Sequence, residues 1–185
     1  MALTKTPVCD FGKKAEDFKL KSIYNKVVTL NDIKGEKATL IMFICNHCPY
    51  VKAIIKDLVK DCKELKKNGI NSVAIMSNDT KNYPEDSFDN MIKFAKANNF
   101  GEINYLIDET QDIAKKYGAV CTPDFFGYNK DLKLQYRGRF RELKDLKPIS
   151  SGDSDLKIAM KMISETQAGP KEQIPSMGCN IKWFN

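Results

Sequence analysis

An apolar run, EKATLIMFIC at residues 36–45, leads directly into a stretch with helical periodicity that begins at Pro49. A run of this length is typical of a strand that is buried on both faces, as in a parallel sheet. From Val51 to Gly69, apolar residues recur every three or four positions and lysines fill the other face. The sequence therefore predicts a buried strand followed by an amphipathic helix, with the proline in its first turn.

Short apolar runs and helical patterns alternate along the rest of the chain. We expect strands on both sides of Asn25 and at 70–76, 103–108, 124–129 and 132–140, and helices at 83–99, 109–118 and 154–166. Alternating helices and strands followed by a late hairpin predict an α/β fold with a mixed sheet. We expect one domain at residues 1–169 and a C-terminal tail, residues 170–185, packed on it.

Composition limits the class of protein. A chain of 185 residues suits one domain with a sizeable core. The net charge of +6 comes from lysines that are spread along the chain, which argues against nucleic-acid binding. No apolar run approaches the roughly 20 residues of a membrane helix, and the first residues lack the apolar core of a signal peptide. We therefore expect a cytoplasmic protein without a membrane partner, either a monomer or a weak dimer.

Two cysteines, Cys45 and Cys48, lie where the strand ends and the helix begins. A helix N-terminus carries partial positive charge and free N–H groups, which stabilise a thiolate. A zinc site would need further ligands, yet the chain has one histidine, His47, and no second C-x-x-C. A structural disulfide across so short a loop would remove little chain entropy. The pair is therefore predicted to be a redox centre, with no metal or other cofactor.

A strand, C-x-x-C-P and a long helix together resemble the thioredoxin fold. Further segments resemble the peroxiredoxin-like branch of that superfamily, the alkyl hydroperoxide reductase/thiol-specific antioxidant domains. These segments are CNHCPYV, AIMSNDTKNYPEDSF, YLIDETQDIAKKYGAVCTPDFFGY, YRGRF and PSMGCNIKW, and GKKAEDFKL resembles the N-terminal hairpin of the same redoxins. The resemblance covers almost the whole chain. It implies a thioredoxin-like fold, with a central mixed β-sheet flanked by helices and an N-terminal β-hairpin extension.

The resemblance also implies residue roles. Cys45 would be the exposed nucleophile and Cys48 the partly buried resolving thiol. Thr122 and a cis Pro123 would face the pair and offer backbone groups to an extended substrate. His47 as a cation would stabilise the thiolate, which predicts a reduction potential above the roughly −270 mV of thioredoxin. The alternative for His47 is a surface position at the start of the helix.

Other thiols and arginines leave alternatives open. Cys121 and Cys179 are candidates for a second thiol pair or a relay to the tail, although simple packing roles are favoured. Arg137 and Arg139 stand in a segment that holds all the arginines of the chain, and alternation along a strand would place them on one side. They are candidates to bind a planar anion, or to pair with nearby acids.

The favoured function is thiol-disulfide exchange through Cys45 and Cys48, with protein or small-molecule thiols and disulfides as partners and an unidentified reductant or oxidant. A peroxidase is the first alternative. Peroxiredoxins carry Pro-x-x-x-Thr/Ser-x-x-Cys, whereas here Met42 stands in the Thr position before Cys45, and Cys45 itself stands there before Cys48. A non-catalytic binding module is the second alternative. A buried acid near the pair is expected in such folds, and only Asp79 is a candidate.

Overall fold

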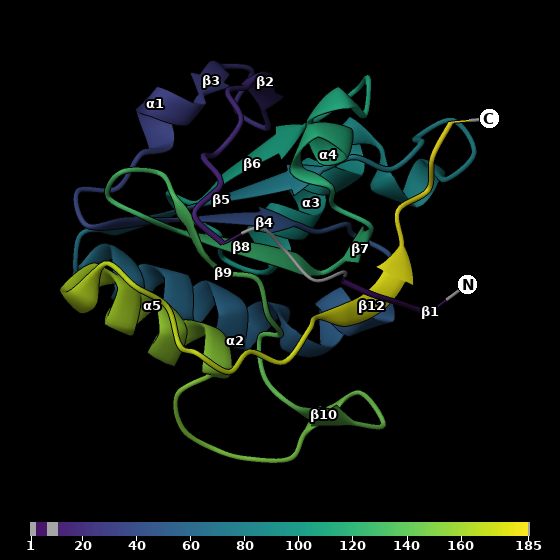
Figure 1. Cartoon of the computed structure of the whole chain (residues 1–185). Coiled ribbons are helices and arrows are strands. Elements are labelled where there is room, and N and C mark those ends of the chain that lie inside the picture. Colours follow the sequence, from purple (N-terminus) through teal and green to yellow (C-terminus); the bar gives the residue numbers. More distant parts are fainter. Residues whose placement is uncertain (1–2, 7–10, 185) are drawn as a thin grey trace.

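The computed structural model describes residues 3–6 and 11–184 of the chain. The main sheet contains β2 (Lys19–Ser22), β3 (Val27–Thr29), β4 (Ala38–Phe43), β5 (Ile70–Met76), β6 (Asn104–Ile107), β8 (Asp124–Asn129) and β9 (Leu134–Tyr136). From edge to edge the order is β3-β2-β6-β5-β4-β8-β9 (Figure 1). The central strands β4, β5 and β6 are parallel, and β8 pairs with β4 in the antiparallel direction. The expected mixed α/β sheet is confirmed.

Helices cover both faces of this sheet. They are α1 (Leu30–Ile33), α2 (Pro49–Lys66), α3 (Phe88–Ala97), α4 (Asp112–Tyr117) and α5 (Asp155–Thr166). Apolar residues of α2, α3 and α5 form one core cluster with the sheet, and those of α1 and α4 form another on the opposite face (Figure 1). All six residues of β4 are buried between the two layers, as the continuous apolar run predicts.

The N-terminal hairpin extends the sheet at one edge. Strands β2 and β3 are antiparallel, and β2 also pairs with β6. Asn25 lies in the turn between them with a φ of 57°. This left-handed conformation is one that asparagine tolerates better than most residues. The expected hairpin extension is therefore present. Cys9, at the start of the chain, lies outside the described residues.

Two segments depart from the expected pattern. The helix expected at 83–99 is interrupted at Ser87, whose extended backbone separates a 3₁₀ turn (η1, Pro84–Asp86) from α3. The strand expected at 132–140 ends at Tyr136. Beyond it, the N–H groups of Arg137 and Arg139 donate to Gln173 and to Ile174 of the tail, so the backbone leaves β8.

The tail belongs to a second, smaller sheet. Its strand β12 (Met177–Asn180) lies between β1 (Leu3–Lys5) and β7 (Cys121–Thr122), with antiparallel pairing on both sides. A short hairpin, β10 (Leu143–Lys144) with β11 (Lys147–Pro148), projects from the lower side in Figure 1. The two ends of the described chain therefore meet beside the carboxyl end of β4, which is where the cysteine pair lies.

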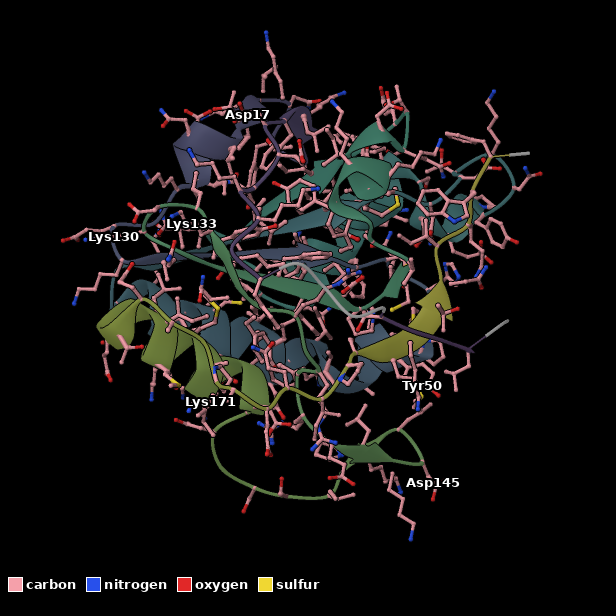
Figure 2. All side chains as sticks on the ribbon, in the orientation of Figure 1. Asp17, Tyr50, Lys130, Lys133, Asp145 and Lys171 are labelled. Carbon is pink, nitrogen blue, oxygen red and sulfur yellow. The ribbon has the colours of Figure 1, made fainter. Side chains whose placement is uncertain are left out.

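The surface is rich in separate lysines. Lys130 and Lys133 stand at the turn between β8 and β9, and Lys171 stands on the tail after α5; all three are exposed (Figure 2). Among the described residues, no helix is both long and apolar enough to cross a membrane.

Candidate active site

The cysteine pair lies at the junction of β4 and α2. Cys45 follows the last residues of β4, and Cys48 is the residue that precedes the first turn of α2, which begins with Pro49. Cys45 is 1% exposed and Cys48 is 0% exposed. The expectation that Cys45 would be exposed is therefore wrong. The reason is tertiary, because segments from the far end of the chain lie over the junction.

The first covering segment is the loop before Pro123. The peptide bond between Thr122 and Pro123 is cis, as expected. The Thr122 hydroxyl lies 3.3 Å from Cys45 Sγ, and its carbonyl oxygen lies 3.1 Å from Cys48 Sγ. Both backbone and side chain of this one residue therefore contact the pair. The loop before Pro123 therefore faces the two thiols.

The second covering segment is β12. Cys179 pairs with Thr122 in the antiparallel ladder, and Asn180 pairs with Cys121. The Cys179 sulfur lies 3.0 Å from Cys48 Sγ. The edge of Thr122 that was expected to receive an extended substrate is thus occupied by the chain's own tail. Cys121 points elsewhere: its thiol lies 3.6 Å from the carbonyl oxygen of Pro123, and burial raises its pKa.

The electrostatics of the two thiols differ. The hydrogen bond from the Cys45 thiol lowers the pKa of Cys48, and the Cys179 thiol and the backbone N–H groups of Val51 and Cys179 lower it further. The pKa of Cys45 is raised well above its ordinary value, first by that same hydrogen bond, then by burial and by the negative charge of Asp86. Burial opposes this shift, but the Cys45 hydrogen bond outweighs it, and a thiolate is favoured at Cys48.

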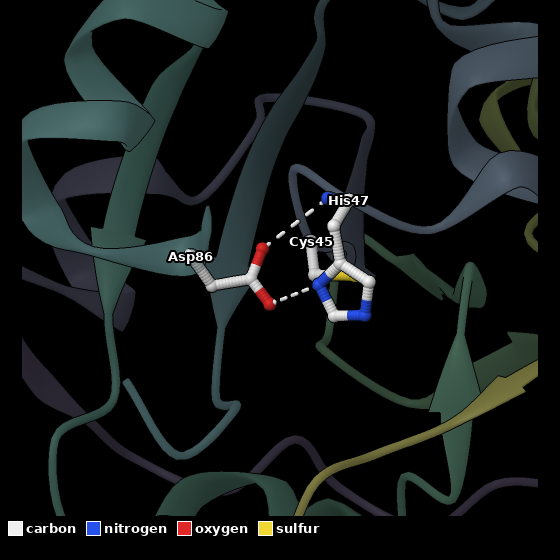
Figure 3. Close-up of side chains that lie close together, drawn as sticks. All are labelled: Cys45, His47 and Asp86. Carbon is white, nitrogen blue, oxygen red and sulfur yellow. Dashed lines mark hydrogen bonds and ion pairs between the residues drawn. The ribbon is translucent and has the colours of Figure 1, made fainter. Parts of the chain in front are cut away.

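Asp86 is the buried acid of the site. Its side chain is fully buried, and its Oδ2 lies 2.7 Å from His47 Nδ1 (Figure 3). Its Oδ1 accepts from the backbone N–H groups of Asn46 at 2.8 Å and His47 at 3.3 Å, and Asn78 Nδ2 donates to Oδ2 at 2.7 Å. The carboxylate therefore shapes the turn between the two cysteines as well as binding the imidazole.

Sequence reasoning missed Asp86. The expected candidate, Asp79, instead binds the backbone N–H groups of Lys81 and Asn82 and closes a local turn. In the sequence, Asp86 is the second of two adjacent acids after Pro84 in NYPEDSF, and nothing local singles it out. Only the tertiary structure brings it to the turn between the cysteines, where it binds Asn46, 40 positions earlier.

Cys45, His47 and Asp86 offer three possible metal-ligand atoms that lie within 4.8 Å of one another. Both carboxylate oxygens of Asp86 already accept hydrogen bonds from four N–H groups. The arrangement therefore resembles an imidazole held by a buried carboxylate more than a set of free ligands. His47 lies in this pair, where Asp86 orients its ring, and is half-buried.

We predict that His47 titrates above its ordinary value. The hydrogen bond to Asp86 raises the pKa of His47 from 6.5, while burial opposes the shift. A raised histidine pKa gives stability that is present below about pH 6.5 and is lost as the pH rises through the folded-state pKa. Because the chain has one histidine, an NMR titration of its ring reports this site alone. Asp86→Asn should lower the midpoint, and an unchanged midpoint would contradict the pairing.

The two candidate anion-binding arginines are engaged by different carboxylates. Arg137 is buried, and its Nη2 donates to Asp124 Oδ2 at 3.0 Å and to the carbonyl oxygen of Gly118 at 2.7 Å. Arg139 Nε donates to Asp155 at 2.6 Å, and its Nη2 donates to Glu142 at 3.2 Å. Since β9 ends before them, the two guanidinium groups do not share a face. The geometry fits pairing with nearby acids, not a joint anion site.

A cavity of about 500 Å³ is lined in part by the cis proline, Pro123. Ser176 of the tail, Tyr50 of α2 and Asp145 of the β10–β11 hairpin also line it, and the last two are labelled in Figure 2.

Solved structures with the same architecture exist. An uncharacterized conserved protein from Geobacillus kaustophilus is 40% identical, with a TM-score of 0.94 over 100% of this chain and 97% of that one. A hypothetical protein from Sinorhizobium meliloti 1021 is 36% identical, with a TM-score of 0.90 over 98% of both chains. The thioredoxin domain of a thiol-disulfide oxidoreductase from Bacteroides vulgatus is 18% identical, with a TM-score of 0.59 over 70% of this chain and 89% of that one, and shares the fold.

No curated protein matches this chain. The AhpC/TSA family model matches residues 11–137, a segment that contains β2 to β9, the C-x-x-C and the cis proline. The chain therefore has a thioredoxin-like redoxin fold and belongs to the AhpC/TSA family.

Proposed function

We propose that this protein is a thiol-disulfide oxidoreductase that works through Cys45 and Cys48. The observation that carries the proposal is the contact of both sulfur atoms with Thr122, directly before the cis Pro123, at the N-terminus of α2. A helix terminus stabilises a thiolate, a second thiol lies within hydrogen-bond reach, and a groove leads to the proline. These are the parts that dithiol–disulfide exchange requires.

The proposed reaction has two exchange steps. The Cys48 thiolate attacks one sulfur of a substrate disulfide, which forms a mixed disulfide and releases the other substrate sulfur as a thiolate. The Cys45 thiol then loses its proton to that leaving thiolate and attacks Cys48 Sγ. A Cys45–Cys48 disulfide forms, and the remaining substrate sulfur leaves as a thiolate. Two electrons pass from the dithiol to the substrate, and the reverse sequence would oxidise a dithiol.

His47 and Asp86 would tune this chemistry. Electrostatic interaction with Cys48 contributes to the raised pKa of His47, so a cationic ring would in turn favour the thiolate at Cys48. Asp86 opposes this effect at Cys45, because its charge raises the pKa of that thiol. His47 and Asp86 therefore act in opposite directions on the pKa values of the two thiols. This supports Cys48 as the attacking thiol and Cys45 as the resolving one.

A side-by-side assay tests the reaction class. The reduced full chain should accelerate reduction of insulin disulfides by dithiothreitol, measured by the precipitation of the insulin B chain. Consumption of hydrogen peroxide with the same reductant should be slow. The chain lacks the Pro and Thr of the peroxiredoxin motif before either cysteine, and the Arg137 guanidinium is paired with Asp124. Fast peroxide turnover without insulin reduction would contradict the proposal.

Peroxide reduction is the second candidate, and one observation favours it. Cys48 has a lowered pKa and has the Cys179 sulfur at 3.0 Å as a possible resolving thiol. The Cys48 thiolate would then be oxidised by the peroxide to a sulfenic acid, and attack by a second thiol would give a disulfide and water. This candidate predicts peroxide turnover that survives Cys45→Ser.

A further inference from the structure

The tail presents Cys179 to the cysteine pair in the way that a bound strand would. Its partner in the ladder is Thr122, the residue before the cis proline, and this pairing directs the Cys179 side chain toward Cys48. Strand addition at a sheet edge fixes which side chains of the added strand face the site. Here the added strand is β12 of the same chain, so the sulfur near Cys48 is permanently tethered.

The tail is anchored on both sides of Cys179. Before it, the Ser176 hydroxyl donates to the carbonyl oxygen of Pro123 at 2.7 Å. After it, the N–H of Lys182 donates to Asn78 Oδ1 at 2.9 Å, and the Lys182 carbonyl oxygen accepts from the N–H of Asp79 at 2.8 Å. These contacts hold the thiol against Cys48 without help from a covalent bond.

We propose that Cys179 is a third redox thiol, which takes over the disulfide from the C-x-x-C by forming a Cys48–Cys179 bond. The proposal rests on the proposed function, which supplies the Cys45–Cys48 disulfide. In the exchange, the Cys179 thiolate attacks Cys48 Sγ, the Cys48–Cys179 bond forms, and the Cys45–Cys48 bond breaks. Cys45 leaves as a thiolate and takes the proton that Cys179 lost. No electrons are gained or lost overall, so no further oxidant is needed.

Distance makes Cys48 the site of attack. The Cys48 and Cys179 sulfurs are 3.0 Å apart, and a disulfide bond of about 2.05 Å needs only a small further approach. Both side chains are buried, so the new bond would lie inside the protein. In this oxidised state the Cys48–Cys179 disulfide holds the tail covalently over the active site, and Cys45 is again a thiol.

The protonation state of Cys179 changes with the state of Cys48. Burial, followed by the hydrogen bond with Cys48, raises the pKa of Cys179 to about 12. When Cys48 is part of a disulfide, its thiolate is gone, and this second cause of the shift disappears. Cys179 is therefore a better nucleophile in the oxidised protein than in the reduced one.

Disulfide mapping on the full chain tests the proposal. The reduced protein is treated with one equivalent of diamide, quenched in acid, blocked with N-ethylmaleimide and digested with trypsin. Cleavage after lysine places Cys45 and Cys48 in peptide 38–52, Cys179 in peptide 172–182 and Cys121 in peptide 117–130. We expect peptide 38–52 linked to 172–182 in the wild type and in Cys45→Ser, and no such link in Cys48→Ser. Absence of the link from either of the first two samples overturns the proposal.

Two further variants sharpen the result. Cys121→Ser should keep the link, since its thiol does not contact the pair. Gly178→Ala should weaken it, because a Cβ at this position would lie 2.1 Å from the Thr122 carbonyl oxygen and would push β12 away. A link that is lost in Cys121→Ser, or unchanged in Gly178→Ala, would contradict the assigned geometry.

The outcomes also separate this proposal from the proposed function. Insulin reduction without a Cys48–Cys179 link would reject the role of Cys179 and leave the C-x-x-C chemistry in place. A Cys48–Cys179 link in a protein that does not reduce insulin would reject the proposed function and leave the thiol pair of the tail in place.

Discussion

Cys48→Ser is expected to lower insulin reduction by at least about 100-fold, because a serine hydroxyl cannot supply a thiolate at neutral pH. Cys45→Ser should also stop turnover of the C-x-x-C cycle, but for a different reason. In that variant the first attack still occurs, and the mixed disulfide is no longer resolved by Cys45. The two single variants therefore differ in whether the mixed disulfide forms, and not in whether turnover is lost.

The attacking thiol is identified by trapping. The double variant Cys45→Ser/Cys179→Ser, treated with 5,5′-dithiobis(2-nitrobenzoic acid), should carry a nitrothiobenzoate adduct on peptide 38–52, which then contains Cys48 alone. In Cys48→Ser/Cys179→Ser the same peptide contains Cys45 alone and should react far more slowly, because burial and Asp86 raise the pKa of that thiol. The rates are measured by mass spectrometry of the quenched peptide.

A matched control and a contrary outcome complete this test. Cys62→Ala should keep wild-type turnover, since that thiol lies in the core on α2 and burial raises its pKa to about 12. Faster labelling of Cys45 than of Cys48 would restore the order of roles that the family resemblance implies. The division of charge between the two sulfurs described above would then be wrong.

Arg137→Met is expected to destabilise the protein by about 3–5 kcal/mol, because it leaves the fully buried Asp124 carboxylate without its partner. Urea denaturation followed by circular dichroism measures the change in the free energy of unfolding. Arg139→Met is the matched control. Its ion pairs with Asp155 and Glu142 are part-exposed, so we expect a cost of no more than about 1 kcal/mol.

The loss of stability in Arg137→Met should increase as the pH rises. Burial raises the pKa of Asp124 to about 6, although Arg137 opposes the shift. A raised carboxyl pKa means that the folded state holds the proton more tightly, so this group's contribution to stability falls as the pH rises from its unfolded to its folded pKa. Without Arg137 the folded pKa rises further. The difference between wild type and Arg137→Met should therefore be larger at about pH 8 than at about pH 5.

Equal effects of the two arginine substitutions, or no pH dependence, would contradict a structural role for Arg137. The sequence left this point open, since three arginines close together in a lysine-rich chain are compatible with an anion site. The decision depends on where β9 ends. Once the backbone N–H groups turn toward Gln173 and Ile174, Arg137 reaches Asp124 on β8, and Arg139 reaches Asp155 on α5.

Local patterns predicted the frame of the site. Strand β4, helix α2 and the cysteines between them follow from apolar periodicity, from Pro49 and from the spacing of Cys45 and Cys48, because each depends on neighbours within a few residues. The cis bond at Pro123 and the N-terminal hairpin were expected from resemblance to known redoxins, and both are present. These features need no knowledge of which distant segments meet.

Contacts between distant residues decided the rest. Asp86 meets His47 across 39 positions, and Cys179 meets Cys48 across 131. Neither meeting leaves a periodic trace in the sequence, because one acid after a proline and one cysteine in a polar tail look the same whether or not they reach the site. The residues alone therefore predict a redox pair at a helix terminus. Only the packing of η1 and β12 on that terminus brings the charge of Asp86 and the thiol of Cys179 to the two cysteines.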